Sequence, residues 1–190
     1  MLNLARRRAI LPPVSALVAV DSTGLESQHI SHYYGRRCGR RMKYFPKLSA
    51  VCDTGTHLFL GVVISRGPSW DHEEFRQTVL GAHRQQPFEH LVADAACDME
   101  RCHGVVRHKL GAKTTIRLRK RPRPGQGRHG EYRQEMEEAF DREAYGQRWQ
   151  IESAFSRCKK RLGSALSARN MWTQRREIEL RVLTHNLMIT

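Results

Sequence analysis

The sequence lacks any apolar run that approaches the roughly 20 residues of a membrane-spanning helix. Residues 6–20 start with arginines and continue into an apolar stretch, as a secretory signal does, but Pro12 and Pro13 interrupt that stretch and no small-residue cleavage site follows. We therefore interpret residues 14–20 as a buried strand. We expect a protein that neither enters a membrane nor is secreted.

Cysteines are few and irregularly spaced. The five cysteines are odd in number and include no pair separated by two residues, so they suggest neither a disulfide framework nor a zinc ribbon. His29 and His32, or Cys97 with Cys102 and His103, lack the two paired ligand sets of a structural zinc site. We expect buried thiols and loop histidines in a protein of the reducing cytoplasm.

Acidic residues are scarce relative to basic ones. The 19 Asp and Glu residues face 33 Lys and Arg residues, which gives a formal net charge of +14. Such a charge indicates a polyanionic partner. Because the basic residues are spread along the chain rather than gathered on one amphipathic helix, nucleic acid is favoured over an anionic membrane.

No internal repeat is visible, and 190 residues are the length of one domain with its own core. The pattern of apolar residues predicts a β-β-β-α-β-α-β order that ends in helices. The predicted elements are a strand at 14–20, a hairpin at 48–67, a helix at 71–85, a strand at 90–98, a helix at 99–110 closed by Gly111, a strand at 113–120, a long helix at 132–162 with room for a break near Gly146, and a final helix whose apolar stripe is Ile178, Leu180, Val182, Leu183 and Leu187. This order is typical of an α/β fold.

Two segments have little apolar periodicity. Residues 22–47 contain Gly, Ser, His, Tyr and several basic residues, and we expect an irregular connection that can lie along DNA. Residues 120–131 are rich in Pro, Gly and Arg, which predicts a mobile basic loop.

Two aspartates follow apolar strands. Asp21 and Asp94 each come at the end of a β-branched or aliphatic run. If these strands are parallel neighbours, both carboxylates meet at one edge of the sheet, where sites in α/β folds usually form. Phosphodiester transfer with two divalent ions about 4 Å apart requires such convergent carboxylates, since Mg²⁺ prefers hard oxygen ligands.

A third carboxylate, Glu152, lies on the predicted long helix. At about 100° per residue, Tyr145, Arg148, Glu152 and Lys159 fall within about 60° of one another. The adjoining apolar stripe consists of Ile151, Phe155, Cys158 and Leu162. Packing that stripe on the sheet turns the polar face toward the aspartates. Glu152 can then complete a metal shell, Arg148 and Lys159 can neutralise phosphate, and Tyr145 can stack beside a distorted DNA backbone.

Simpler interpretations exist for several of these residues. A single Asp at a strand end is more often a turn former than a metal ligand, and charges on a helix are usually a solvated face. Asp98 and Glu100 stand where a helix begins, so we interpret them as capping residues that favour its dipole. For Trp149 and Trp172 we favour core packing over stacking on flipped bases.

The chain resembles the DDE transposases of bacterial insertion sequences. Their signature is a Tyr, two residues, an Arg, three residues, a Glu, six residues and a Lys, which Tyr145, Arg148, Glu152 and Lys159 match in full. The resemblance extends to VAVDST around Asp21, to KLSAVCDTGTHLFLGVVISRG with the following Asp71 and Glu74, and to LVADAACDME around Asp94. It covers about residues 14–188.

The resemblance implies a ribonuclease H-like fold, with a mixed sheet of about five strands flanked by helices. It implies two Mg²⁺ or Mn²⁺ ions held by Asp21, Asp94 and Glu152, which are then the catalytic residues, and DNA contacts by Tyr145, Arg148 and Lys159. The implied reaction is hydrolysis at the ends of the element, followed by attack of the freed 3′ hydroxyl on target DNA. The implied partner is double-stranded DNA, both transposon ends and target, bound by a homodimer at the bacterial nucleoid.

The chain departs from that family in two respects. The segment before residue 14 is too short for the usual helical domain that binds DNA ends, and the interval between Asp94 and Glu152 is short. We therefore expect residues 1–190 to form one catalytic domain of a truncated transposase. The alternatives are a ribonuclease H-like nuclease without strand transfer and an inactive remnant that only binds DNA.

Overall fold

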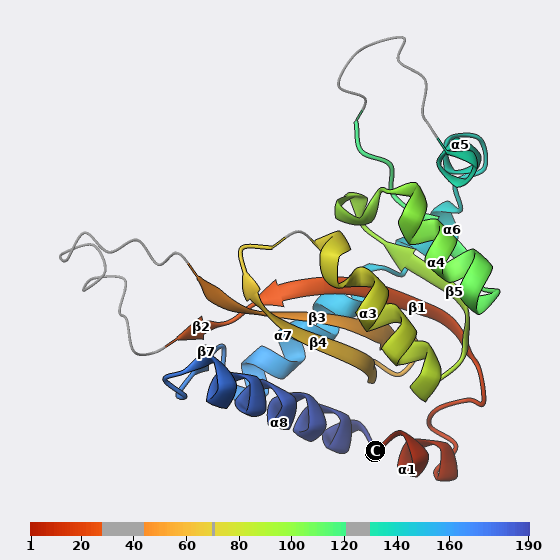
Figure 1. Cartoon of the computed structure of the whole chain (residues 1–190). Helices are drawn as coiled ribbons and strands as arrows, with labels where there is room; N and C mark the ends of the chain where they lie inside the picture. Colours follow the sequence, from red (N-terminus) through yellow and green to blue (C-terminus); the bar gives the residue numbers. More distant parts are fainter. Residues whose placement is uncertain (28–43, 70, 121–129) are drawn as a thin grey trace.

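The computed structural model describes residues 1–27, 44–69, 71–120 and 130–190 of the chain (Figure 1). The strands are β1 (Ser15–Gly24), β2 (Glu26–Ser27), β3 (Phe45–Asp53), β4 (Phe59–Gly67), β5 (Phe88–Ala93), β6 (Lys113–Ile116) and β7 (Ala165–Leu166). The helices are α1 (Leu2–Arg7), α3 (Asp71–Gln85), the 3₁₀ turn η1 (Ala95–Cys97), α4 (Glu100–Leu110), α5 (Glu131–Glu138), α6 (Arg142–Gly146), α7 (Trp149–Leu162) and α8 (Met171–Ile189). The DNA-facing connection and the basic loop expected from the sequence fall largely outside the described residues. Within the described segments, none of the helices has both the length and the apolar character needed to cross a membrane.

Five strands form one mixed sheet in the order β4-β3-β1-β5-β6. The β4-β3-β1 part is antiparallel, whereas β1, β5 and β6 run parallel to one another. The two short strands β2 and β7 pair separately. The prediction of a mixed five-stranded α/β sheet flanked by helices is therefore confirmed.

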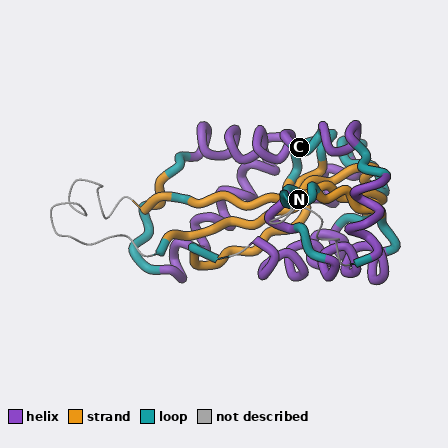
Figure 2. Tube along the Cα trace, turned by 90° about the horizontal axis from the view of Figure 1, so that it is seen from above, coloured by secondary structure: helices purple, strands orange, loops and turns teal. Residues whose placement is uncertain are grey.

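Helices cover both faces of the sheet, so the domain has three layers (Figure 2). The central strand β1 is buried on both sides, as its nearly continuous apolar run predicts. Val18 and Val20 pack in the cluster that contains α3 and α4. Ala19 packs in the opposite cluster with Ile151 of α7 and Ile178 of α8. Helix α7, which carries Glu152, covers this second face of the sheet. Glu152 therefore approaches the aspartates from that face.

Close packing of α3 on β4 depends on Gly61. A Cβ atom at this position lies 2.6 Å from the backbone nitrogen of Ala82. Because that contact is with backbone, no side-chain rotation relieves it. Gly61 thus sets the distance between the sheet and α3.

The buried His103 on α4 should make the stability of the folded protein depend on pH. It is fully buried, with Nδ1 2.7 Å from the Thr114 hydroxyl, and burial lowers its pKa to about 4. Between pH 6.5 and 4 the unfolded chain binds a proton that the folded protein does not bind, so stability falls as the pH falls. Between pH 7 and pH 5 the free energy of unfolding, measured with urea, should fall by about 1–2 kcal/mol more for the wild type than for His103→Gln. Equal pH dependence of the two proteins contradicts this assignment.

The helix expected at 132–162 is divided into three helices, and of the two breaks only the one after Gly146 was expected. The Asp141 side chain accepts a hydrogen bond from the backbone N–H of Ala144 and caps α6, which starts a new helix instead of continuing α5. A second break separates α6 from α7, where Arg148 is the N-cap residue. The polar face counted along one continuous helix therefore comes from two helices.

Two expectations about apolar residues are also wrong. Trp149 and Trp172 are 53% and 61% exposed rather than packed in the core. On α8 the inner face is formed by Ile178 and Val182 together with three polar residues, Gln174, His185 and Asn186. The expected stripe members Leu180, Leu183 and Leu187 lie on the exposed side of α8. Asn186 replaces apolar packing with two hydrogen bonds to the backbone of Phe59, an arrangement that helical periodicity of apolar residues does not reveal.

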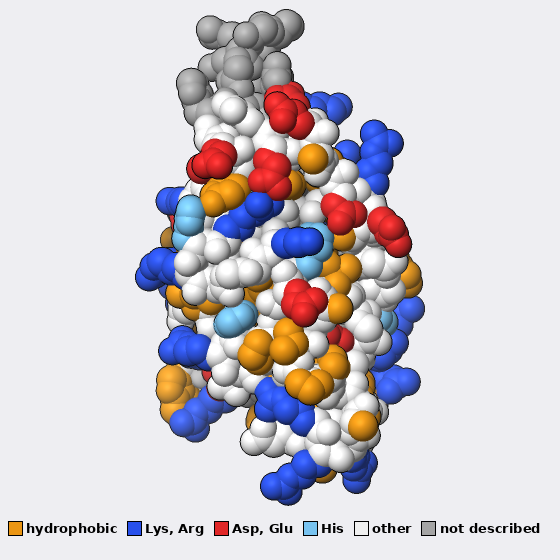
Figure 3. All heavy atoms as spheres, turned by 90° about the vertical axis from the view of Figure 1, so that its right-hand side faces the viewer, with side chains coloured by type: hydrophobic (Ala, Val, Ile, Leu, Met, Phe, Trp, Pro, Cys, Tyr) orange, Lys and Arg blue, Asp and Glu red, His pale blue; other side chains and the backbone are white. Residues whose placement is uncertain are grey.

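Charge is unevenly distributed over the surface. Figure 3 shows a face on which acidic side chains gather in the upper part among scattered Lys and Arg. Helix α5 alone, with the sequence EYRQEMEE, supplies four glutamates. The net charge of +14 is thus not spread evenly over the molecule.

Candidate active site

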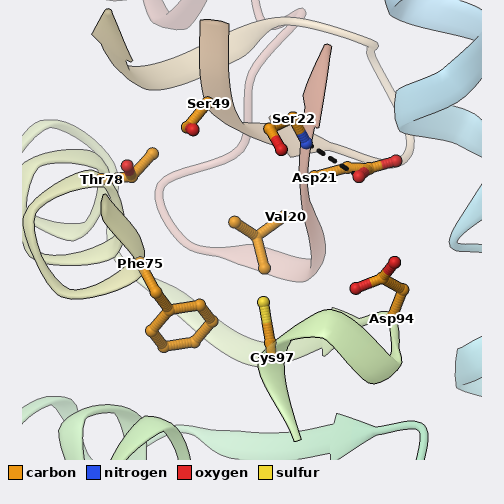
Figure 4. A pocket seen from close by; sticks show the side chains of 8 residues that line it. All are labelled: Val20, Asp21, Ser22, Ser49, Phe75, Thr78, Asp94 and Cys97. Atoms are coloured by element: carbon orange, nitrogen blue, oxygen red, sulfur yellow. Dashed lines mark hydrogen bonds between the residues drawn. The ribbon is translucent and has the colours of Figure 1, made fainter. Parts of the chain in front are cut away.

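Asp21 and Asp94 lie at equivalent positions on neighbouring parallel strands. In the β1–β5 pairing Val20 is opposite Ala93, and the next residue along each segment is an aspartate, Asp21 within β1 and Asp94 directly after β5. Both side chains line one small pocket, together with Ser22, Ser49 and other residues (Figure 4). The structure therefore brings the two aspartates together, although Asp21 does not end its strand as the sequence predicted, because β1 continues to Gly24.

Local hydrogen bonds orient each aspartate. Asp21 Oδ1 accepts from the backbone N–H of Ser22 at 2.8 Å. Asp94 Oδ1 accepts from the backbone N–H of Ala96 at 2.9 Å, and Asp94 is thereby the N-cap of η1. A capped turn directly after β5 fixes this carboxyl group at the edge of the sheet.

Glu152 is connected to Asp21 by one arginine. Arg148 Nη1 donates to Asp21 Oδ2 at 3.2 Å, and its Nη2 donates to Glu152 Oε1 one helical turn along. Burial disfavours the guanidinium charge, but the charges of Glu152 and Asp21 raise the pKa of Arg148 above its ordinary value. The same cation therefore neutralises carboxylates from β1 and α7.

Lys159 and Tyr145 flank this cluster. Lys159 Nζ donates to the Thr23 hydroxyl at 2.6 Å and to the Gly24 carbonyl at 2.8 Å, both on β1. Burial lowers the pKa of this lysine. Tyr145 is half-buried on α6, with its ring 5.1 Å from that of Phe140. Lys159 is thus fixed beside the strand that carries Asp21, whereas Tyr145 comes from a separate helix.

A wider hollow lies between β1 and α7. It has a volume of about 450 Å³, and its lining includes Asp21, Glu152, Ser156, Lys159 and Lys160. Asp21 lines both this hollow and the small pocket that contains Asp94. The three carboxylates therefore surround two adjoining spaces that meet at Asp21.

The donor chemistry of these residues fits a divalent metal ion. All three side chains offer hard carboxylate oxygens, the ligands that Mg²⁺ prefers. Asp21 and Glu152 both contact the Arg148 guanidinium, so both reach a common cation. Across the described segments, no three His, Cys, Asp or Glu side chains are close enough to form a complete metal cluster. Because the Arg148 guanidinium lies between Asp21 and Glu152, a metal ion held by both carboxylates would compete with it.

This competition predicts the effect of Arg148→Gln on metal binding. Removing a cation that contacts two of the three carboxylates should tighten Mn²⁺ binding by roughly tenfold, which corresponds to about 1.4 kcal/mol. The measurement is a titration of free Mn²⁺ by electron paramagnetic resonance without DNA. Arg161→Gln, near the other end of the same helix, removes an equal charge and serves as the control. Equal Mn²⁺ affinities for the two variants are incompatible with competition at this site.

Asp98 has partners that the sequence did not indicate. Asp98 is not an N-cap of α4, whose N-cap is Met99 and has no side-chain cap bond. Instead, the buried Asp98 carboxylate accepts from Arg133 Nε at 2.7 Å and from the backbone N–H of Arg119 at 2.8 Å. Arg119 also donates to the carbonyls of Ala95 and Ala96. These contacts hold the turn that carries Asp94.

Glu100 stands in the first turn of α4 as expected and has a further role that was not expected. It lies in the first turn of α4, but its carboxylate accepts from the backbone N–H groups of Tyr132 and Arg133. Glu100 therefore caps the start of α5 across the tertiary structure. No sequence signal indicated this contact, because 32 residues separate Glu100 from Tyr132.

Two other residues of the wide hollow could have been assigned to the site from the sequence. Ser156 and Lys160 follow Glu152 by one and two helical turns, so the periodicity that selected Lys159 also places them near the site.

Comparison with known structures supports the fold assignment. The chain is similar to the catalytic core domain of BIV integrase, with a TM-score of 0.50 and 14% identity over 90% of this chain and 82% of that one. It is also similar to the piggyBac transposase in a synaptic complex with hairpin DNA, with a TM-score of 0.53 and 10% identity over 93% of this chain. The similar region spans about half of the piggyBac chain, 47% of its length. The fold is thus the ribonuclease H-like core of integrases and transposases.

The family is established by sequence. Residues 12–187 match the model of the transposase DDE domain. No curated protein sequence matches the chain. The chain belongs to the transposase DDE domain family and has the core of a transposase-type nuclease, in a family whose members generally use divalent metal ions.

Proposed function

We propose that this chain is the catalytic domain of a bacterial insertion-sequence transposase that cleaves DNA and transfers the cleaved strand. The observation that supports this most strongly is the placement of three carboxylates by three separate elements. Asp21 on β1 and Asp94 after β5 share one pocket, and Glu152 on α7 shares the adjoining hollow with Asp21. Family membership makes a phosphodiester the natural substrate of such a site.

In this proposal Asp21, Asp94 and Glu152 are the catalytic residues and hold two Mg²⁺ or Mn²⁺ ions. When bound, the ions activate the attacking oxygen and stabilise the departing one. A water oxygen first attacks the phosphorus at the element end, and the bond to the 3′ oxygen breaks to leave a 3′ hydroxyl. That hydroxyl then attacks a target phosphodiester, forming one P–O bond while the bond to the leaving oxygen breaks.

The basic residues act on the DNA. With Glu152 holding a metal ion, the Arg148 guanidinium would have donors for a phosphate, to which it can bind in bidentate fashion. Lys159 is held 2.6 Å from the Thr23 hydroxyl, where its charge offsets that of a backbone phosphate. Tyr145 offers a half-buried ring for stacking beside a distorted backbone.

The partner in this proposal is double-stranded DNA, first the transposon end and then the target. We further propose that residues 1–190 act as one domain, pair as a homodimer across two DNA ends, and work at the nucleoid of a bacterial cell. The formal charge of +14 supports binding to a polyanion.

A joining assay tests the proposal. Duplexes with randomised ends and exposed 3′ hydroxyls are mixed with supercoiled plasmid, protein and Mg²⁺ or Mn²⁺, and junctions are recovered by amplification across the joint. Metal-dependent junctions sharing a duplex-end sequence are the expected result, and they also identify the recognised end. Nicked plasmid without junctions indicates a nuclease without strand transfer. Binding without nicks or junctions indicates a remnant that only binds DNA.

A further inference from the structure

The exposed side of α7 continues beyond Glu152 as a polar strip that lies outside the signature residues. This strip consists of four residues spaced by three, one and three positions along α7: Ser153, Ser156, Arg157 and Lys160. With about 3.6 residues per turn, these four side chains lie on one face of the helix, beside Glu152 and away from the buried stripe. All four are half-buried or exposed.

This strip forms the wall of a groove. A second hollow of about 250 Å³ is lined by Ser153, Ser156, Arg157, Lys160 and Arg161. Ser156 and Lys160 also line the hollow that contains Asp21 and Glu152. The two hollows therefore join into one groove that leads from the carboxylates along α7.

The three cations that line the second hollow form no ion pair with a described carboxylate. In the part of the chain that the structure describes, no carboxylate pairs with Arg157, Lys160 or Arg161. On α8, by contrast, Arg175 and Arg181 each pair with a glutamate one turn away. The helix dipole favours Lys160 and Arg161 near the C-terminus of α7, but it explains neither Arg157 in the middle of the helix nor the two serines.

We propose that this groove binds the phosphate backbone of the DNA duplex that enters the carboxylate site. The inference rests on the proposed function and adds a binding surface to it. Hydroxyl groups and cations together are the groups that proteins use for phosphate oxygens. From Glu152 to Lys160 the helix rises about 12 Å, and a DNA strand has one phosphate per 3.4 Å of helix axis, so the groove has room for roughly three phosphates.

The groove is tested by the salt dependence of DNA binding without metal, measured by fluorescence anisotropy with a labelled duplex of arbitrary sequence. The test protein carries Lys160→Gln and Arg161→Gln, both at exposed positions. Its control carries Arg84→Gln and Lys109→Gln on α3 and α4, also exposed and on the opposite face of the sheet. A single Ser156→Asp variant places a repelling charge where the two hollows meet and provides an independent readout.

The groove double variant should bind roughly tenfold more weakly than the control, with a salt slope about 1–2 less steep, since each phosphate contact contributes about 0.9 to the slope. Ser156→Asp should weaken binding in the same direction. If both double variants have the wild-type slope and affinity, the groove is not a DNA site, although the wild type still binds DNA. If the wild type itself shows no salt-dependent binding, the proposed function fails, and the groove proposal fails with it.

Discussion

Replacing Asp94 with alanine should lower metal-dependent nicking of supercoiled plasmid by at least about a hundredfold. Changes to residues that merely support metal ligands typically cost ten- to a hundredfold, so the loss of a direct ligand should cost no less. Asp94 shares its pocket with Asp21, and its carboxylate is already oriented by the backbone N–H of Ala96. The measurement is the initial rate of nicking in Mg²⁺ and in Mn²⁺, with an EDTA control.

Two further variants distinguish a loss of catalysis from a loss of folded structure. Asp94→Asn keeps an oxygen that can cap η1 but removes the charge, so it should retain stability and still lose nicking. Asp141→Ala removes the equivalent N-cap of α6 at an exposed position and should nick at nearly the wild-type rate. Wild-type nicking by Asp94→Asn excludes Asp94 as a metal ligand.

The largest effect on stability is expected from Asp98→Ala. The Asp98 side chain is 0% exposed, and it accepts charge-assisted hydrogen bonds from Arg133 at 2.7 and 3.1 Å. Removing one partner of a buried ion pair leaves the other charge uncompensated, at a cost of about 3–5 kcal/mol. Arg133 keeps 24% exposure, so we expect the lower end, about 3 kcal/mol, in the free energy of unfolding by urea.

A more exposed carboxylate with the same kinds of partner provides the control. Glu177 accepts from two backbone N–H groups and pairs with Arg181, but its side chain is 23% exposed. Glu177→Ala should therefore cost less, about 1 kcal/mol. If Asp98→Ala costs no more than Glu177→Ala, the buried pair does not stabilise the turn after β5.

Much of the fold could be predicted because its strands carry strong local signals. The apolar run before Asp21 and the run before Asp94 both predict buried strands, and these strands have the parallel pairing that a shared carboxylate site requires. The αL conformation of Gly111 at the end of α4, with φ 67°, follows the C-cap preference of glycine. Such signals depend on neighbouring residues and are visible in sequence.

The rest depends on contacts between distant residues. The side chain of Asp141 competes for the backbone and divides the expected long helix, although its neighbours have helical propensity. Asp98 was assigned to the nearest helix start, whereas its partner Arg133 is 35 residues away. A buried charge is not distinguishable in sequence from a capping charge until its partner is known.

For the candidate site, the sequence predicted which residues assemble but not how they pair. Helical spacing placed Arg148 and Glu152 on one face, and strand patterns placed Asp21 at the sheet edge. The ion pairs from Arg148 to both carboxylates depend on the angle at which α7 crosses β1, which no local pattern encodes. The sequence therefore suggested Arg148 as a phosphate ligand and gave no indication that it pairs with two of the three carboxylates.

The central claim is that Asp21, Asp94 and Glu152 hold metal at one site, and Fe²⁺-directed cleavage of the protein tests it most directly. Fe²⁺ replaces Mg²⁺ in the presence of duplex DNA, ascorbate and peroxide generate hydroxyl radicals at the bound ion, and the cut positions are read by mass spectrometry. The account predicts cuts clustered around residues 21, 94 and 152 that excess Mg²⁺ suppresses and Asp94→Ala abolishes. Cuts confined to other segments, or cuts at these positions that persist in Asp94→Ala, contradict it.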